Sequence, residues 1–186
     1  KLKRIAFMRA GSMMFNQRGY MGTSLDEIAS QLDVTKGAFY YHIKNKEDLL
    51  YQCFTRTLEL ENQMIDLAKS AGENGAEKIE LILRYLFNIQ HSDEGPLIRY
   101  RSLPSMNQDH RLSILQMTED ISHQLGELIA EGIEDGSIRD VDSSVIENAI
   151  AGAVDSAPGV ARRMQFTDNS RISAEYCQLF FNGIAG

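Results

Sequence analysis

The sequence predicts an all-α protein in which a small N-terminal unit of three helices precedes a larger helical domain. Three observations predict this fold class. The 186 residues include only three prolines, apolar residues recur three and four positions apart along most of the chain, and few segments alternate apolar with polar residues. We place the domain boundary between residues 1–47 and 48–186. With 43% hydrophobic residues, such a chain buries a core without a metal or a disulfide.

The first predicted helix runs from about Leu2 to Gln17, and the "RGY" that follows ends it. The residues that we expect to face a core are Ile5, Met8, Ala10 or Ala6, Met13 and Phe15.

The second predicted helix begins in "TSLDEIASQL". Ser24 followed three residues later by Glu27 is the spacing of a capping box, in which each side chain bonds a free amide of the first turn. The apolar stripe of this helix consists of Leu25, Ile28, Ala29 and Leu32.

A short third helix over about residues 35–43 follows the tight turn "DVT". Val34, Phe39 and Ile43 are expected to face the core. A fourth helix starts in "NKEDLLYQCF", with Asn45 as its N-cap and two acidic residues in its first turn. Two short helices joined by a tight turn match the helix-turn-helix plan, in which the second helix enters the DNA major groove.

Longer and more apolar helices are predicted after residue 70. They lie in "AEKIELILRYLFNIQ", "RLSILQMTEDISHQLGELIAEGIEDG", "SSVIENAIAGAVDSA" and "ISAEYCQLFFNGIAG". The first is apolar on most sides and is therefore expected to be buried on most sides. Gly136 ends the second, and Pro158 is expected to end or kink the third.

The last two predicted helices look like an interface, although an ordinary internal helix pair is the alternative. One carries small residues that permit close approach, and the other carries large aromatic anchors. The candidate interface residues are Ile150, Ala153, Val154, Tyr176, Phe180 and Phe181.

Charge is divided unevenly along the chain. Its formal net charge is −7, yet residues 1–46 carry eight basic and three acidic residues, whereas the remainder carries 11 basic and 23 acidic residues. A basic head on an acidic body indicates a polyanion partner for the head alone.

Polar and aromatic residues are left over on the third helix once its core positions are removed. Lys36 can reach a phosphate or a guanine edge, and tyrosine hydroxyls can donate to phosphates. Gly37 lets the backbone approach either a neighbouring helix or DNA, and both alternatives stay open. The candidate DNA-binding residues are Thr23, Ser24, Thr35, Lys36, Gly37, Tyr40, Tyr41, His42 and Lys46.

Residues 19–50, "GYMGTSLDEIASQLDVTKGAFYYHIKNKEDLL", resemble the DNA-binding domain of TetR-family transcriptional regulators. The matching positions are Gly19, Tyr20, Thr23, Ser24, Ile28, Ala29, Val34, Lys36, Gly37, Tyr40, Lys46, Glu47 and Leu49. The chain departs from the pattern at His42, where an aromatic residue is common, and at Ile43, where phenylalanine is common. His42 either donates to a phosphate, in which case binding weakens as the ring loses its proton, or is buried and hydrogen-bonded.

The resemblance implies a homodimeric, ligand-responsive regulator, with repression as its expected action, that binds a palindromic operator and is released by a small-molecule effector. Dimerisation through the last two helices is part of that implication. Candidate ligand-binding residues are Arg84, Tyr85, Asn88, Ile89, Arg99, Met117 and Ile121, for each of which core packing or a surface salt bridge is the alternative. The effector class cannot be read from the sequence.

Two other classes of protein compete with a regulator. An enzyme would have to use His91, Asp93 and Glu94 as a metal site or Asp109 with His110 as a catalytic pair, but neither set has a functional spacing. We expect no enzyme activity, cofactor or metal. A helical small-molecule-binding or adaptor protein without sequence-specific DNA binding is the second competitor. No run of apolar residues approaches membrane-spanning length, so we expect a cytoplasmic protein with two buried, reduced cysteines.

Overall fold

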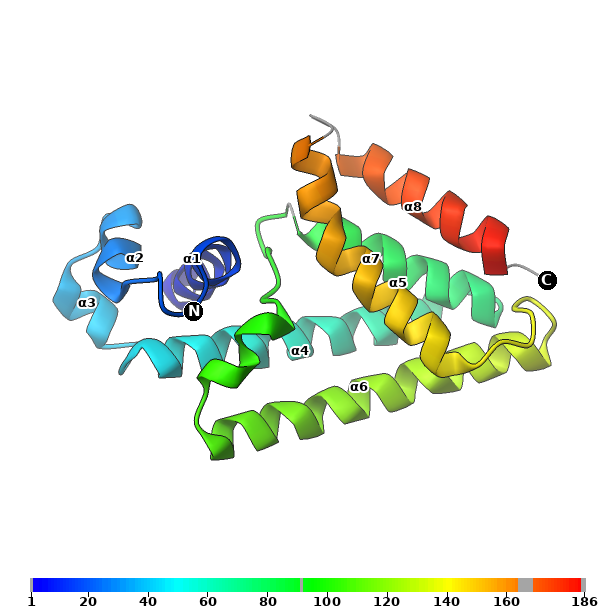
Figure 1. The fold of residues 1–186 in the computed structure, drawn as a ribbon, viewed down its shortest axis with the longest axis horizontal. Coiled ribbons are helices and arrows are strands. Elements are labelled where there is room, and N and C mark those ends of the chain that lie inside the picture. The colour runs from blue at the N-terminus through cyan, green and yellow to red at the C-terminus, as the bar shows by residue number, and fades with distance from the viewer. Residues whose placement is uncertain (1, 91, 164–168, 185–186) are drawn as a thin grey trace. The chain divides into compact units, whose positions relative to one another are not determined.

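A computed structural model describes the backbone of residues 2–90, 92–163 and 169–184, and all its regular elements are helices (Figure 1). This confirms the predicted all-α class. The elements are α1 (Leu2–Arg18), α2 (Leu25–Gln31), α3 (Lys36–Tyr40), α4 (Lys46–Ala71), α5 (Gly75–Ile89), the 3-10 helix η1 (Tyr100–Ser105), α6 (Gln108–Glu134), α7 (Ser143–Arg163) and α8 (Asn169–Ile184).

The chain forms two compact units. The first, which we call the head unit, comprises residues 1–59 and 92–118, and the second, the body unit, comprises residues 60–91 and 119–186. The predicted boundary after residue 47 separates two domains by their functions, which a division by compactness does not test, so it stays a prediction. The segment between α5 and α6 belongs to the head unit, which the sequence did not indicate.

Aromatic side chains build the core of the head unit. Phe7, Phe15, Phe39 and Phe54 are each exposed by 1% or less, and the rings of Phe7 and Phe39 lie 4.8 Å apart. The predicted core face of α1 was partly wrong, because Phe7 and Met14 are buried whereas Ile5 and Met13 are only half-buried. The apolar residues of this helix are distributed over several of its sides, so its sequence alone favours no single buried stripe.

The predicted capping box at the start of α2 is also wrong. Ser24 is the N-cap residue, but its side chain makes no capping hydrogen bond. Glu27 pairs instead with Arg18, whose Nη1 lies 3.1 Å from its Oε2. A tertiary ion pair has therefore replaced the local bond that the spacing allowed.

Side chains of α1 and α4 fasten the segment that follows α5. The Asn16 amide donates to the Leu97 carbonyl at 2.7 Å and accepts from the Arg99 backbone amide at 2.9 Å. Thr57 Oγ1 accepts from the Ile98 amide at 3.0 Å, and both Leu97 and Ile98 are buried. These bonds satisfy backbone groups that a loop would otherwise bury unpaired.

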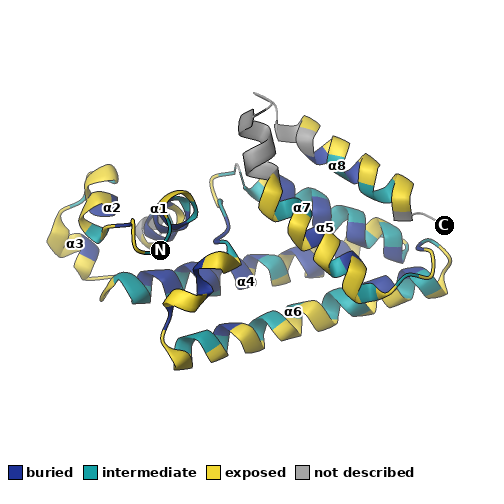
Figure 2. Cartoon of the chain, in the orientation of Figure 1, coloured by how far each residue is buried: buried dark blue, intermediate teal, exposed yellow. Residues whose placement is uncertain are grey.

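Helix α5 lies at the centre of the body unit, where it packs against α7 and α8. From Ile79 to Phe87 none of its residues is exposed, which confirms the prediction of burial on most sides (Figure 2). Its first turn meets α6 at glycines: a Cβ on Gly75 would lie 2.2 Å from the Gly132 Cα, so no side chain fits there. Gly136, with φ of +78°, follows the end of α6 as predicted.

Helix α7 continues through Pro158 to Arg163, so the alternative of an end at Pro158 is wrong, whereas a kink there stays a prediction. Tertiary packing can hold a helix together despite the one backbone hydrogen bond that a proline removes. Within the described residues, no helix has the length and apolar character needed to cross a membrane.

Glu61 is a half-buried carboxyl group on the side of α4 that also carries the buried residues Met64, Ile65 and Ala68. Burial raises its pKa to about 7. The unfolded carboxyl ionises near pH 4.3, at roughly the value of a free glutamate. The folded state therefore binds a proton that the unfolded state has lost between these two pH values.

We expect the free energy of unfolding to fall as pH rises from about 4 to about 7, by up to about 3 kcal/mol, and to stay low above that range. Glu61→Gln should remove this decline and stabilise the protein at pH 8. Urea denaturation at pH 5.5 and 8 measures both effects. Glu59→Gln, on an exposed neighbour, is the control, and equal pH dependence in wild type and Glu61→Gln would contradict the expectation.

Candidate nucleic-acid interface

The short helix α3 owes its position to two anchors and a cap. Phe39 and the following Ile43 are completely buried, as predicted, and Val34 is half-buried. Thr35 is the N-cap, and its Oγ1 accepts from the Ala38 amide at 3.3 Å. The helix ends at Tyr40, earlier than the predicted residue 43, and Tyr41 and His42 form the turn that follows.

Before and between these anchors, α3 and the turn after it expose polar and aromatic residues to solvent (Figure 2). Tyr41 is 85% exposed and Tyr40 is 45% exposed. Exposed tyrosines of this size suit a surface that contacts another molecule, because their rings offer apolar area and their hydroxyls offer hydrogen bonds. The predicted residues that share this exposed segment are Thr35, Lys36, Gly37, Tyr40, Tyr41 and His42.

The structure decides between the two alternatives for His42. The residue is exposed, and its ring lies 4.9 Å from the Tyr41 ring and 5.8 Å from the Phe7 ring. The alternative of a buried, hydrogen-bonded histidine is therefore wrong.

Gly37 likewise has one alternative removed. A Cβ built on it would meet nothing within 4 Å. The glycine is therefore not needed for close approach to another helix of this chain, and approach to an external partner is the alternative left.

Thr23 and Lys46 are tied into the fold of the head unit. Thr23 is 2% exposed, and its hydroxyl donates to the Gly19 carbonyl at 2.8 Å. The ammonium of Lys46 donates to the Thr23 carbonyl at 3.1 Å and lies 4.5 Å from the centre of the Tyr20 ring. The Thr23 hydroxyl thus has no hydrogen left to donate, whereas Ser24 is exposed.

Lys36 has a close acidic neighbour that the sequence did not single out. Its Nζ lies 2.6 Å from Asp26 Oδ2, and both side chains are exposed. The hydrogen bond that Lys36 donates to this carboxylate, and then the carboxylate's charge, raise the pKa of Lys36. The spacing of residues within one helix cannot reveal this pair, because Asp26 lies on α2 and Lys36 on α3.

The predicted ligand-binding residues are divided between the two units. Arg99 and Met117 belong to the head unit, and the others belong to the body unit. Arg84 is paired with Glu80 of its own helix at 2.5 Å, and Asn88 is exposed. Arg84 would have to exchange this carboxylate in order to anchor a ligand, and its ligand-binding role stays a prediction.

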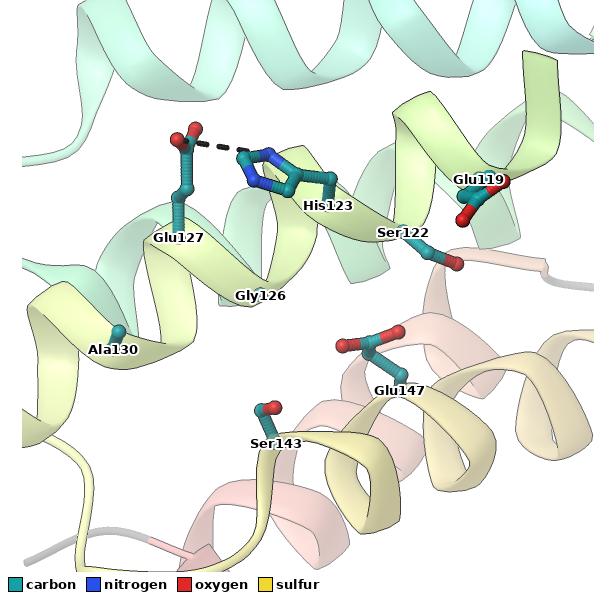
Figure 3. Close-up of a pocket in the computed structure, with 8 residues that line it drawn as sticks. All are labelled: Glu119, Ser122, His123, Gly126, Glu127, Ala130, Ser143 and Glu147. Atoms are coloured by element: carbon teal, nitrogen blue, oxygen red, sulfur yellow. Dashed lines mark ion pairs between the residues drawn. The ribbon is translucent and has the colours of Figure 1, made fainter. Parts of the chain in front are cut away.

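The body unit has an open hollow of about 510 Å³ between α6 and α7 (Figure 3). Figure 3 shows Glu147 of α7 pointing toward α6, on which His123 pairs with Glu127 at 3.6 Å. The hollow contains none of the predicted ligand-binding residues. Its lining consists of Glu119, Ser122, His123, Gly126, Glu127, Ala130, Ser143 and Glu147.

The predicted interface residues of α7 and α8 differ in exposure. Ile150 is 3% exposed and packs inside the body unit, so it offers no area to a partner. The Tyr176 ring lies 4.8 Å from the Phe87 ring and is tilted against it by 31°. Tyr176 is half-buried, as are Ala153, Val154, Phe180 and Phe181. Among the side chains of these helices that the structure describes, the exposed large apolar residues are Val145, at 58%, and Leu179, at 75%.

The residues suggested for an enzyme have structural partners. His110 stacks on Tyr51 at 4.3 Å, and its Nδ1 lies 2.9 Å from Glu47 Oε1. His91 lies outside the described residues, within which no group of three or more potential metal ligands occurs. Burial raises the pKa of the Cys53 thiol to about 12, so this cysteine is not a nucleophile at neutral pH.

Comparisons with known proteins agree on one family. Residues 7–53 match the family model described as bacterial regulatory proteins, tetR family, and residues 72–159 match the tetracyclin repressor-like C-terminal domain. The chain is 28% identical over 150 residues to the Transposon Tn10 TetC protein of Escherichia coli, covering 79% of this chain and 74% of that protein. It is 26% identical over 162 residues to the fatty acid metabolism regulator protein of Bacillus subtilis, covering 83% and 82%.

Among solved structures, AibR in complex with isovaleryl coenzyme A and operator DNA is similar in fold. Its TM-score is 0.73 at 21% identity, covering 96% of this chain and 98% of that chain.

Because Lys46 joins the start of α4 to Thr23, two residues before α2, Lys46→Met should lower the free energy of unfolding by about 1 kcal/mol. A lost cation–π contact and a lost hydrogen bond are each of this order. Urea denaturation measures the change. Lys44→Met, on an exposed neighbouring lysine, is the matched control, and equal stability of the two variants would contradict the role assigned to Lys46.

Proposed function

Because the chain belongs to the TetR family of bacterial regulatory proteins, we propose that it is a transcriptional repressor that binds a palindromic operator as a homodimer and is released by a small-molecule effector. The observation that carries this proposal is the exposed surface of α3 and the turn that follows it, on which Lys36 is exposed and Tyr41 is 85% exposed. We propose residues 1–47 as its DNA-binding domain and residues 48–186 as its ligand-binding and dimerisation domain.

In this proposal α3 enters the major groove, and the candidate DNA-binding residues are divided by role. Lys36, Tyr40 and Tyr41 reach base edges or thymine methyl groups, and Gly37 lets the backbone come close to the DNA. Ser24, Thr35, His42 and Lys46 contact phosphates, which fix the orientation of the head unit but carry no sequence information. The buried Thr23 supports Lys46 through its carbonyl and does not contact DNA itself.

Dimerisation follows from how little DNA one short helix covers. A five-residue helix reads only part of a binding site, whereas a two-fold dimer places two such helices on successive major grooves, about 34–36 Å apart. We propose that α7 and α8 form the dimer interface. Val145 and Leu179 join Ala153, Val154, Tyr176, Phe180 and Phe181 in it, because they are exposed apolar residues on these two helices.

Release by an effector requires a difference in affinity between two states of the protein. A ligand that binds the DNA-incompetent state more tightly lowers DNA affinity, whereas equal binding to both states changes nothing. AibR was solved with isovaleryl coenzyme A, so acyl thioesters are a reasonable first class to screen here.

The alternative is a helical small-molecule-binding or adaptor protein without sequence-specific DNA binding. In that case the exposed Tyr41 would contact a protein partner. Binding to duplex DNA that weakens steeply with salt would favour the regulator. No catalytic step is part of either proposal.

The first test is selection of binding sites from random duplexes, followed by footprinting of the enriched sequence. We expect a palindrome whose half-sites lie about one helical turn apart. Lys36→Ala and Tyr41→Ala should each weaken operator binding by about 10–100-fold while changing random-duplex binding less. Glu134→Ala, an exposed change in the body unit, is the control. Enrichment of no sequence would contradict the proposed function.

The dimer interface is tested by Leu179→Glu. Burying an unpaired carboxylate at the centre of an interface is costly, so the variant should sediment as a monomer and bind the operator at least about 10-fold more weakly. Leu112→Glu, on an exposed leucine of α6 in the head unit, is the matched control. If both variants sediment like the wild type, α8 is not in the interface.

A further inference from the structure

The ion pair between Asp26 and Lys36 joins the first turn of α2 to the first residue of α3. Its atoms lie 2.6 Å apart, whereas the side chains are 50% and 70% exposed. An exposed pair of this kind is weak, because water solvates both charges well. The lysine can therefore exchange its carboxylate partner for another acceptor without unfolding the head unit.

We propose that Asp26 is an internal competitor for Lys36, which holds the lysine in the unbound protein and thereby lowers the affinity for operator DNA. This inference rests on the proposed function. Asp26 itself need not contact a base. Its role is to make the release of Lys36 costly in every complex in which the lysine contacts DNA.

The cost arises from charge. When Lys36 turns toward DNA, Asp26 loses its neutralising partner and faces the negative potential of the phosphates. A guanine edge, with two acceptors in the major groove, repays that cost, whereas a poorly placed acceptor does not. Lys36 therefore leaves Asp26 on the operator and stays paired on a poorly matched duplex, so the release cost lowers operator affinity more than random-duplex affinity.

Glu27 provides a matched comparison within the same turn of α2. It is also a carboxylate paired with a cation, since its Oε2 lies 3.1 Å from Arg18 Nη1. Arg18 is the last residue of α1 and not part of α3. Neutralising Glu27 therefore changes the net charge of the head unit by the same amount without releasing Lys36.

The experiment compares Asp26→Asn, Glu27→Gln, Lys36→Met and the double variant Asp26→Asn/Lys36→Met. Fluorescence anisotropy at fixed salt gives the dissociation constants for the selected operator and for a random duplex. We expect Asp26→Asn to tighten operator binding about 10-fold but random-duplex binding only about 2- to 3-fold, so that discrimination rises. Glu27→Gln should tighten both equally, and Asp26→Asn should not alter discrimination in the Lys36→Met background.

Two results would overturn the inference. If Asp26→Asn and Glu27→Gln leave the ratio of the two dissociation constants equally unchanged, Asp26 contributes only net charge. If Asp26→Asn weakens operator binding alone, its carboxylate accepts a hydrogen bond from a base and reads the sequence directly. Thermal unfolding checks that both variants are folded. Absence of any sequence preference in the wild type would instead defeat the proposed function, so the two failures are distinguishable.

Discussion

The burial of Phe39 and Ile43 is the constraint on which the DNA-binding surface depends. Both side chains are fully buried, and Phe39 packs on Phe7 of α1. A helix of five residues is far shorter than the roughly 12–15 residues at which isolated helices persist in water. Helix α3 therefore exists because its two anchors are held from outside, and its exposed residues are positioned only as well as that core is packed.

Polar contacts complete the head unit and also limit what its charged residues can do. Lys46 donates a hydrogen bond to the Thr23 carbonyl and lies over the Tyr20 ring. Asp26 forms an ion pair with Lys36. A cation in such a contact serves the fold and the partner at once. The strength of each internal contact then sets how readily that cation is given up to DNA.

Polar contacts also hold the segment that follows α5. Asn16 and Thr57 bond its backbone through side chains of α1 and α4, and Glu47 at the start of α4 accepts from the Asn107 amide and contacts His110. This segment therefore stabilises the helix that follows α3. Helices α4 and α6 each contribute residues to both units, so a change in either helix is not confined to one unit.

The sequence by itself determined the features that depend on neighbours within one helical turn. It predicted the all-α class, the caps Thr35 and Asn45, the anchors Phe39 and Ile43, and the glycine that ends α6. Tertiary structure decided the burial of Thr23, the partners of Lys46 and Lys36, the failure of the Ser24 capping box, and the course of α7 through Pro158. Caps and apolar stripes are written in short-range spacing, whereas an ion pair or a buried hydroxyl depends on which distant segment the fold brings beside it.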